Sequence, residues 1–317
     1  MGILEKLRSQ AAKNPRRVVL PEQGDPRVVE AARMLVANGW AQPVFLAPAA
    51  EPIEGVEVIS ERADSAQVLE SAAAALAEVR AKKGMTIEQA REALKNPLTL
   101  GAILLRMGHV DAGVAGSLAT TADVLRAGIQ ALGMAAGSGL VSSAFIMEFP
   151  DRVFCFGDCA VVPDPDSSQL AQIAVSSART FQRLSGETAR VAMLSFSTKG
   201  SAEHAAVSKV REATALAQTL APDLAIDGEL QFDAALLPAI GERKAPGSPV
   251  AGQANVFIFP DLGAGNIGYK IAERLGGANA IGPILQGMAK PWMDLSRGCK
   301  AEDIANVAVI ASLLAGR

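Results

Sequence analysis

The stretch Asn255-Val-Phe-Ile-Phe-Pro-Asp-Leu-Gly-Ala-Gly-Asn-Ile-Gly-Tyr-Lys270 is the part of this chain from which its fold is most readily predicted. Residues 255–259 have the apolar composition of a buried strand, the glycines that follow predict a turn, and Ile267–Leu275 has the pattern of a helix. In that geometry the backbone N–H groups and the positive end of the helix dipole point at an anion held in the turn.

A polar segment, Asp294-Leu-Ser-Arg-Gly-Cys-Lys-Ala-Glu-Asp303, follows farther along the chain. It brings a hydroxyl, a guanidinium and a carboxylate close together in sequence. These groups are suited to holding a phosphate and moving a proton beside it. We therefore expect the chemistry of the protein to lie in or near this segment.

Composition restricts the class of protein. The chain has 317 residues, of which 50% are hydrophobic and 20% charged, with a net charge of −3. It is long enough for two domains, or for one domain with an insertion, and has the composition of a soluble globular protein. The weakly acidic balance argues against a nucleic-acid surface, and no apolar run is long enough to span a membrane or to form a signal peptide. The three cysteines predict free thiols in a reducing cytoplasm.

Short apolar runs alternate with amphipathic segments, which predicts an α/β fold with mostly parallel sheets. The predicted strands are Arg17–Leu20, Pro43–Leu46, Val56–Ile59, Val110–Ala115, Ser143–Glu148, Val153–Gly157, Ala189–Phe196, Ala225–Asp233 (with its turn) and Asn255–Phe259. The predicted helices are Gly2–Asn14, Pro26–Leu35, Ser65–Lys83, Thr86–Leu94, Leu98–Met107, Ser167–Leu184, Ala205–Leu220, Ile267–Leu275 and Ala301–Ala315, and Gly116–Arg126 is predicted to be a Gly-Ser turn that leads into a helix. The small, flexible residues 134–140 are predicted to be a crossover between two domains.

Three further segments have compositions that suit an anion. The turn at Gly116-Ser-Leu-Ala-Thr-Thr121 joins a strand to a helix, although Ser and Thr also simply cap helices. Arg80 and two lysines end a long helix, where positive charge is favourable without any ligand. Residues 194–201 end a strand in hydroxyls, a lysine and a glycine, and ligands bind at the ends of parallel strands.

The glycines of the opening stretch match the dinucleotide-binding pattern G-x-G-x-x-G at Gly263, Gly265 and Gly268. The pattern also requires an acidic residue about twenty positions later, and residues 284–290 contain none. A nicotinamide dehydrogenase is therefore disfavoured. Bound phosphate or close backbone packing remain as reasons for the glycines.

Other enzyme classes fit the sequence poorly. The evidence for a Ser-His-Asp hydrolase is weak, because His109 and His204 are the only histidines and there is no G-x-S-x-G motif. Cysteine and histidine never cluster at zinc-ligand spacing, and the carboxylates of residues 227–233 lack calcium-loop spacing. Cys159 and Cys299 are either reactive or small buried thiols, and we expect the latter.

Together, several blocks of the sequence resemble the phosphate acetyltransferase (phosphotransacetylase) family, and the resemblance covers nearly the whole chain. The blocks are Leu194–Ser201, Ile226–Ala234, Lys244–Val250, Phe259-Pro-Asp-Leu, Gly265–Lys270, Ala280–Gly287 and Asp294-Leu-Ser-Arg-Gly-Cys299. Members of that family interconvert acetyl-CoA and orthophosphate with acetyl phosphate and CoA. CoA is then a co-substrate, and no permanently bound cofactor and no metal are implied.

The resemblance also implies an architecture. It predicts two α/β domains with a cleft between them, similar to isocitrate and isopropylmalate dehydrogenases, in a homodimer. Domain I would comprise residues 1–137 and 283–317, and domain II residues 138–282. The length matches the catalytic region of the family without added regulatory domains.

Site residues follow from the resemblance, position by position. Ser296 and Arg297 match the Ser-Arg pair of the family's active site, and Asp303 matches its catalytic aspartate. Arg80 and Arg126 match arginines that bind the phosphates of CoA. Thr198, Lys199 and Gly200 are expected to contact phosphate or CoA in the cleft.

The chain departs from the family pattern at Gly263, at Trp292-Met293 and at Gly116-Ser-Leu-Ala119, and each departure is expected to affect acyl-chain preference or loop order. Alternatives to acetyl transfer are propionyl or butyryl transfer, or a non-catalytic domain that senses acetyl-CoA. The expected partners are small-molecule substrates, without nucleic acid or membrane.

Overall fold

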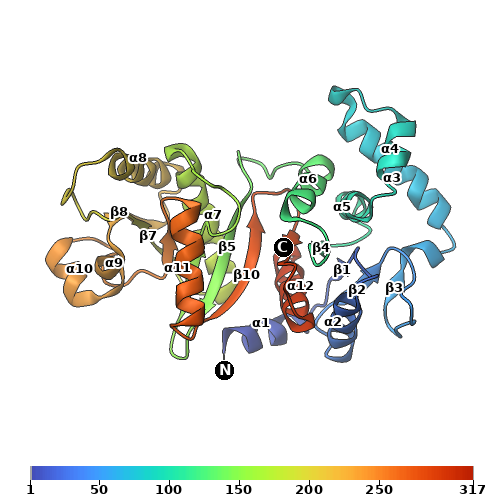
Figure 1. Cartoon of the computed structure of the whole chain (residues 1–317), viewed down its shortest axis with the longest axis horizontal. Helices are drawn as coiled ribbons and strands as arrows, with labels where there is room; N and C mark the ends of the chain where they lie inside the picture. Colours follow the sequence, from blue (N-terminus) through green and yellow to red (C-terminus); the bar gives the residue numbers. More distant parts are fainter. Residues whose placement is uncertain (1, 317) are drawn as a thin grey trace. The chain divides into compact units, whose positions relative to one another are not determined.

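The computed structural model describes residues 2–316, which form two compact units, each around its own β-sheet (Figure 1). Unit 1 consists of Ile3–Ala136 and Met288–Arg317, and unit 2 of Gly137–Gly287 together with Gly2. Both units combine helices with a largely parallel sheet, which confirms the predicted α/β class.

The sheet of unit 1 is entirely parallel, with the order β11-β4-β1-β2-β3. Its strands are β1 (Arg17–Val19), β2 (Gln42–Phe45), β3 (Glu57–Val58), β4 (Ala112–Ala115) and β11 (Trp292–Asp294). Because the strands run in one direction, the segments that follow β1, β4 and β11 leave the sheet at the same edge. That edge is where open parallel sheets bind ligands.

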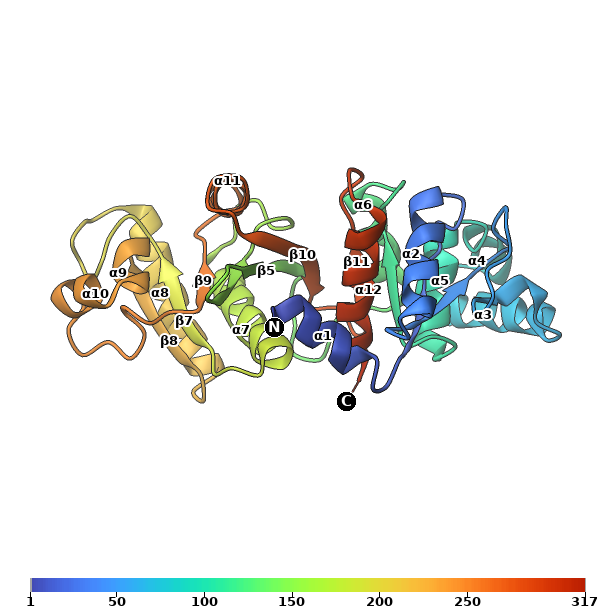
Figure 2. The same cartoon turned by 90° about the horizontal axis from the view of Figure 1, so that it is seen from below.

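Helices cover both faces of this sheet (Figures 1 and 2). In one group α2 and α1 pack against α12, and in the other α5 packs against α6 and α3. The helices of unit 1 are α1 (Ile3–Ala11), α2 (Pro26–Ala37), η1 (Ile59–Glu61), α3 (Ser65–Val79), η2 (Ala81–Lys83), α4 (Ile87–Ala93), α5 (Pro97–Met107), α6 (Thr121–Ala131) and α12 (Ala301–Ala315).

Local sequence explains where several of these helices begin. The side chains of Asp25, Asn96 and Thr120 accept hydrogen bonds from free amides in the first turns of α2, α5 and α6. Thr86 forms a capping box with Gln89 at the start of α4. Residues 116–119 form a loop, where the sequence predicts a Gly-Ser turn, and the helix that follows begins at Thr121 because Thr120 caps it.

The sheet of unit 2 has the order β10-β5-β6-β9-β7-β8, antiparallel at the β10-β5-β6 end and parallel elsewhere. Its strands are β5 (Ser142–Glu148), β6 (Val153–Gly157), β7 (Arg190–Leu194), β8 (Ala225–Leu230), β9 (Val256–Ile258) and β10 (Asn279–Gln286). Residues 284–286, which the resemblance assigned to domain I, pair with β5 in this sheet.

The helices of unit 2 are α7 (Ser167–Ser185), α8 (Ala205–Leu220), α9 (Phe232–Leu236), α10 (Pro238–Lys244) and α11 (Leu262–Arg274). The short helices α9 and α10 were not predicted. Each has at most seven residues, which is too few to show a helical repeat of apolar positions.

The glycine segment of the opening stretch is not a turn. Asp261 caps α11 by accepting a hydrogen bond from the Ala264 amide, so Gly263, Gly265 and Gly268 lie within the helix. A Cβ atom on Gly265 would lie 2.3 Å from the carbonyl oxygen of Asp158, and one on Gly268 would lie 3.0 Å from the ring of Phe259. Close packing therefore explains these two glycines, and the cap of the helix uses the protein's own carboxylate.

Trp292, one of the positions where the chain is expected to depart from the family pattern, fills the core of unit 1. It is 1% exposed, and its indole lies against Gly101, Gly113 and Gly128. A Cβ on Gly113 would lie 2.4 Å from the indole, so these glycines make room for it. Trp292 is thus a packing residue beneath α6 and lines no described pocket.

Candidate active site

Three loops of unit 1 meet at the carboxyl edge of its sheet. They follow β1, β4 and β11, whose registers pair Val18 with Ala112 and Asp294 with Ala115. The loop after β11 carries Ser296 and Arg297. Its backbone is held by Arg27, at the start of α2, which follows the loop after β1.

Glu22, in the loop after β1, organises the loop after β4. Its carboxylate is 7% exposed and accepts five hydrogen bonds of 2.7–3.1 Å. The donors are the amides of Gly116, Ser117, Leu118 and Ala119 and the Ser117 hydroxyl. The Gly-Ser loop does bind an anion, as its sequence predicts, but that anion is the carboxylate of Glu22. These amides are not free for a substrate phosphate.

Arg27 links all three loops. Its guanidinium donates to the carbonyl oxygens of Arg297 and Cys299, both at 2.8 Å, and to that of Ser117 at 2.9 Å. It is also ion-paired with Asp25 at 2.7 Å. Burial raises the pKa of Asp25, but the bonds from Arg27 outweigh it and the pKa lies below the ordinary value. Arg27 therefore fixes the backbone on both sides of Gly298.

Sequence reasoning missed Glu22 and Arg27. Their hydrogen-bond partners are 94–97 residues away for Glu22 and up to 272 residues away for Arg27. The available signal was three charged residues within the seven that follow a buried strand, at the edge where ligands bind.

The three predicted catalytic residues lie within one loop and the first turn of α12. Ser296, Arg297 and Asp303 are all exposed. The Ser296 hydroxyl accepts a hydrogen bond from the Gly298 amide at 3.3 Å, and the Asp303 carboxylate accepts one from the Lys300 amide at 2.8 Å. The Arg297 guanidinium forms no hydrogen bond or ion pair with residues 2–316. A free cation, a hydroxyl and a carboxylate are therefore available to a ligand.

The predicted CoA-binding arginines also belong to unit 1. Arg80 is the C-cap of α3 and is half-buried, and its Nε is buried without a hydrogen-bond partner among the described residues. Arg126 lies on α6, where its side chain is 62% exposed and paired with Asp123 at 2.6 Å. A phosphate at Arg126 would compete with that ion pair.

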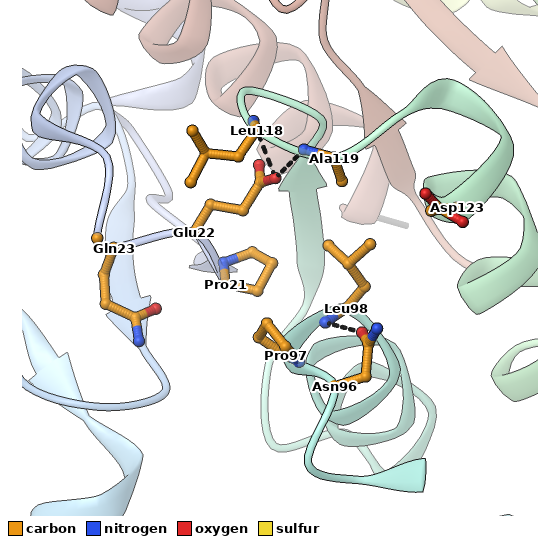
Figure 3. Close-up of a pocket in the computed structure, with 10 residues that line it drawn as sticks. Pro21, Glu22, Gln23, Asn96, Pro97, Leu98, Leu118, Ala119 and Asp123 are labelled. Atoms are coloured by element: carbon orange, nitrogen blue, oxygen red, sulfur yellow. Dashed lines mark hydrogen bonds between the residues drawn. The ribbon is translucent and has the colours of Figure 1, made fainter.

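A pocket of about 500 Å³ opens between the loops after β1 and β4 and the start of α5 (Figure 3). Its walls are largely apolar, with Pro21, Pro97, Leu98 and Leu118 beside the amides of Gln23 and Asn96. Asp123, the partner of Arg126, also lines it. The pocket therefore places an apolar surface close to a helix that carries an exposed cation.

The predicted contacts Thr198, Lys199 and Gly200 lie in unit 2, in the loop between β7 and α8. Their partners are internal: the Gly200 amide donates to Glu229 at 2.8 Å, and Lys199 is ion-paired with Asp227. Glu229 is 2% exposed; burial raises its pKa, and bonds from Arg211, Gly200 and Ser197 bring it below the ordinary value. A buried glutamate thus organises a ligand-edge loop in this unit, as Glu22 does in unit 1.

Cys155, Cys159 and Cys299 are free and buried, as expected of small core thiols. Burial raises the pKa of each thiol. Within residues 2–316, no group of three or more His, Cys, Asp or Glu side chains is arranged to hold a metal ion. Among the described helices, none is both long and apolar enough to cross a membrane.

Solved structures similar to this one include phosphotransacetylases. The EutD phosphotransacetylase from Staphylococcus aureus is 41% identical with a TM-score of 0.90, and the match covers 99% of this chain and 98% of that one. The 4-hydroxythreonine-4-phosphate dehydrogenase from Klebsiella pneumoniae shares the fold alone, at 13% identity and a TM-score of 0.52. This distant likeness is consistent with the predicted dehydrogenase-like architecture.

Sequence comparison leads to the same group. The phosphate acetyltransferase of Thermoanaerobacterium thermosaccharolyticum is 48% identical over 97% of both chains, and that of Acetivibrio thermocellus is 46% identical over 99% of this chain and 98% of the relative. A family model described as phosphate acetyl/butaryl transferase matches residues 2–312. The chain therefore belongs to the phosphate acetyl/butaryl transferase family of acyl-transferring enzymes.

Proposed function

We propose that this protein transfers an acetyl group reversibly between CoA and orthophosphate, by direct attack of the CoA thiolate on acetyl phosphate in a ternary complex. The observation that carries the proposal is the segment 296–303. It offers an exposed hydroxyl, an unpaired guanidinium and an exposed carboxylate on a backbone fixed by Arg27. The family relatives, named as phosphate acetyltransferases, support acetyl as the acyl group.

Each residue has a chemical role in this reaction. Asp303 accepts the thiol proton of CoA as the sulfur attacks the carbonyl carbon of acetyl phosphate. The carbonyl π electrons move to its oxygen, and the Ser296 hydroxyl stabilises the resulting oxyanion by donating a hydrogen bond. When the intermediate collapses, the bond from carbon to the phosphate oxygen breaks and Arg297 holds the departing phosphate. The proton taken by Asp303 leaves to phosphate or solvent, which completes the balance.

CoA acts as a co-substrate, and we propose that Arg80 and Arg126 bind its phosphates. The pocket beside α6 supports this assignment because its apolar walls suit the less polar parts of CoA near an exposed arginine. Thr198, Lys199 and Gly200 are proposed as further contacts to phosphate or CoA. Lys199 must then exchange its ion pair with Asp227 for a substrate anion.

A homodimer is part of the proposal. Ile267, Ile271 and Leu275 follow one another at four-residue intervals along α11 and its C-cap, and they are 61%, 54% and 85% exposed. Residues at that spacing share one helix face. Light scattering should give twice the chain mass for the wild type and a lower mass for Ile271→Lys. A wild type that stays monomeric at micromolar concentration refutes this part.

The buried free thiols support a reducing, cytoplasmic location.

The function is tested by steady-state kinetics with purified protein. Acetyl phosphate should be consumed only when CoA is present, and initial rates at varied concentrations of both substrates should give intersecting lines. Parallel lines indicate an acetyl-enzyme and contradict direct transfer. Absence of turnover contradicts the proposal that the protein is an enzyme and favours the alternative of a non-catalytic domain that senses acetyl-CoA.

A further inference from the structure

Asp294 is a buried carboxylate that the proposed chemistry does not use. It is the last residue of β11, two positions before Ser296, and it is 2% exposed. Its Oδ2 atom accepts a hydrogen bond of 2.6 Å from the hydroxyl of Thr121, in the first turn of α6. Its Oδ1 atom is buried and accepts no hydrogen bond from any of residues 2–316. Burying a carboxylate in this way is costly.

Among residues 2–316, no cation forms an ion pair with Asp294. Glu22, in the loop after β1, is the charged group that acts on it. On the elements that adjoin these loops, Asp25 pairs with Arg27, and Asp123 pairs with Arg126 on α6. On α12, Asp303 accepts the Lys300 amide and Glu302 pairs with Arg8. The carboxylate is therefore held by a hydroxyl and not by an ion pair.

The same side chain contacts the backbone that leads to the catalytic loop. Gly116 has a φ of +108°, and a Cβ there would lie 2.5 Å from Oδ1 of Asp294 and 2.8 Å from the Leu295 nitrogen. The loop after β4 thus packs directly on Asp294 and on the peptide that enters the Ser296 loop. Any rotation of the Asp294 side chain has to move one of these segments.

Ionisation of Asp294 falls within an accessible pH range. Burial, with a smaller contribution from the charge of Glu22, raises its pKa to about 6 against the lowering effect of the bond from Thr121. At neutral pH the group is mostly ionised and accepts the hydrogen bond of the Thr121 hydroxyl. In acid it becomes a neutral carboxylic acid, which holds this donor more weakly.

A second contact joins β11 to α6. The indole Nε1 of Trp292 donates to the carbonyl oxygen of Val124 at 3.0 Å. With the Thr121–Asp294 bond, this ties the first and last residues of β11 to the first turn of α6 at two points, three residues apart on the helix. The position of the Ser296 loop is therefore set relative to α6.

We propose that Asp294 is a positioning residue: its carboxylate, held by Thr121, sets the geometry of the loop that carries Ser296 and Arg297. This inference rests on the proposed acyl transfer. Asp294 does not touch the substrates. It acts through the Leu295 peptide, so its loss lowers the rate of the chemical step more than substrate binding.

The test compares kcat and KM of the wild type with those of Asp294→Asn and Thr121→Val between pH 5 and pH 8. At pH 8, both variants should lose kcat by roughly ten- to a hundredfold, since small misplacements of reacting groups cost this much. KM values should change less than about threefold. Ionisation of the substrates affects the wild type and the variants equally, so it cancels in the ratio of wild-type to variant kcat. For Asp294→Asn that ratio should fall towards one at pH 5, where wild-type Asp294 is neutral.

Two controls separate positioning from general damage. Thr121→Ser keeps the hydroxyl and should restore wild-type kcat, whereas Thr121→Val should not. The double variant should be no slower than the slower single variant, because both changes act on the same contact: one removes the donor hydroxyl and the other removes the charge of the acceptor. A kcat ratio for Asp294→Asn that does not change with pH, or a Thr121→Val enzyme with wild-type kcat, overturns the inference while leaving the proposed function intact. A wild type without CoA-dependent turnover overturns both.

Discussion

At the scale of single residues, the groups proposed to react and the groups that hold them differ in exposure. Ser296, Arg297 and Asp303 are exposed, whereas Glu22, Asp25 and Asp294 behind them are at most 7% exposed. Glu22 accepts hydrogen bonds from loop amides, Asp25 pairs with Arg27, and Asp294 accepts a hydrogen bond from Thr121. Precise placement of exposed groups thus depends on buried charge.

Asp294 should make the stability of the protein depend on pH. Its folded-state pKa, about 6, lies above the ordinary value of 3.8. The folded protein therefore holds this proton more tightly than the unfolded chain, and stability present below pH 3.8 is lost as the pH rises through 6. The Asn side chain of Asp294→Asn does not titrate, so the variant does not lose this stability as the pH rises. The difference in unfolding free energy between variant and wild type should grow by roughly 2 kcal/mol from pH 4.5 to 7.5 in urea titrations. A difference that is constant with pH contradicts the raised pKa.

Arg126 is a residue whose role can be separated from folding, because its side chain is 62% exposed. Arg126→Ala should raise KM for CoA by about tenfold, as loss of one charge-assisted contact to phosphate does. This increase in KM should vanish with CoA that lacks its 3′-phosphate. Arg91→Ala, which removes an exposed, ion-paired arginine of α4, is the matched control and should leave KM unchanged. An equal increase in KM with both forms of CoA refutes the assignment.

The residue scale also shows what sequence could not reveal. Ser296, Arg297 and Asp303 stand in one short polar segment and were predicted from it. Glu22 and Arg27 act on backbone groups up to 272 residues away, and hydrogen bonds to backbone leave no mark on the sequence of the partner. Asp294 was quoted only as the start of the polar segment, because its burial depends on the packing of three loops.

At the scale of elements, the pattern of apolar residues predicted most of the strands and helices. The strand Val153–Gly157 and the helices Ala205–Leu220 and Ala301–Ala315 were predicted with the observed ends. The predicted start of α11 was wrong, because Asp261 caps this helix before the glycines that were expected to form a turn.

The glycines of α11 give a direct test of close packing. Gly265→Ala would bring a Cβ to 2.3 Å from the Asp158 carbonyl oxygen, whereas at Gly263 the contact is a side-chain oxygen of Asp261 at 3.1 Å. In a helix, glycine to alanine alone stabilises by roughly 0.5–1 kcal/mol. We expect Gly265→Ala to destabilise unit 2 by about 1–3 kcal/mol through overpacking, and Gly263→Ala to have little effect. Thermal unfolding measures both. Equal melting temperatures would show that packing does not explain Gly265.

At the scale of the whole molecule, both units use one design. Each presents the carboxyl ends of parallel strands, and each secures a loop at that edge with a buried glutamate, Glu22 in unit 1 and Glu229 in unit 2. The alternation of strands and helices predicted this α/β class from the sequence. The pairing of β10 with β5 was not predicted, because 131 or more residues separate the paired positions and the strand contains Gly282-Pro283.

The central claim is that Asp303 is the base of an acyl transfer carried out by the segment 296–303. Asn at this position can still accept the Lys300 amide, so Asp303→Asn should preserve the start of α12. Its neighbour Glu302, exposed and paired with Arg8, provides the control Glu302→Gln. The most direct measurement is kcat for CoA-dependent consumption of acetyl phosphate by these two variants and the wild type. The account predicts a loss of about 10²–10⁴-fold for Asp303→Asn, with the KM for CoA nearly unchanged and Glu302→Gln as active as wild type. Wild-type kcat in Asp303→Asn would contradict it.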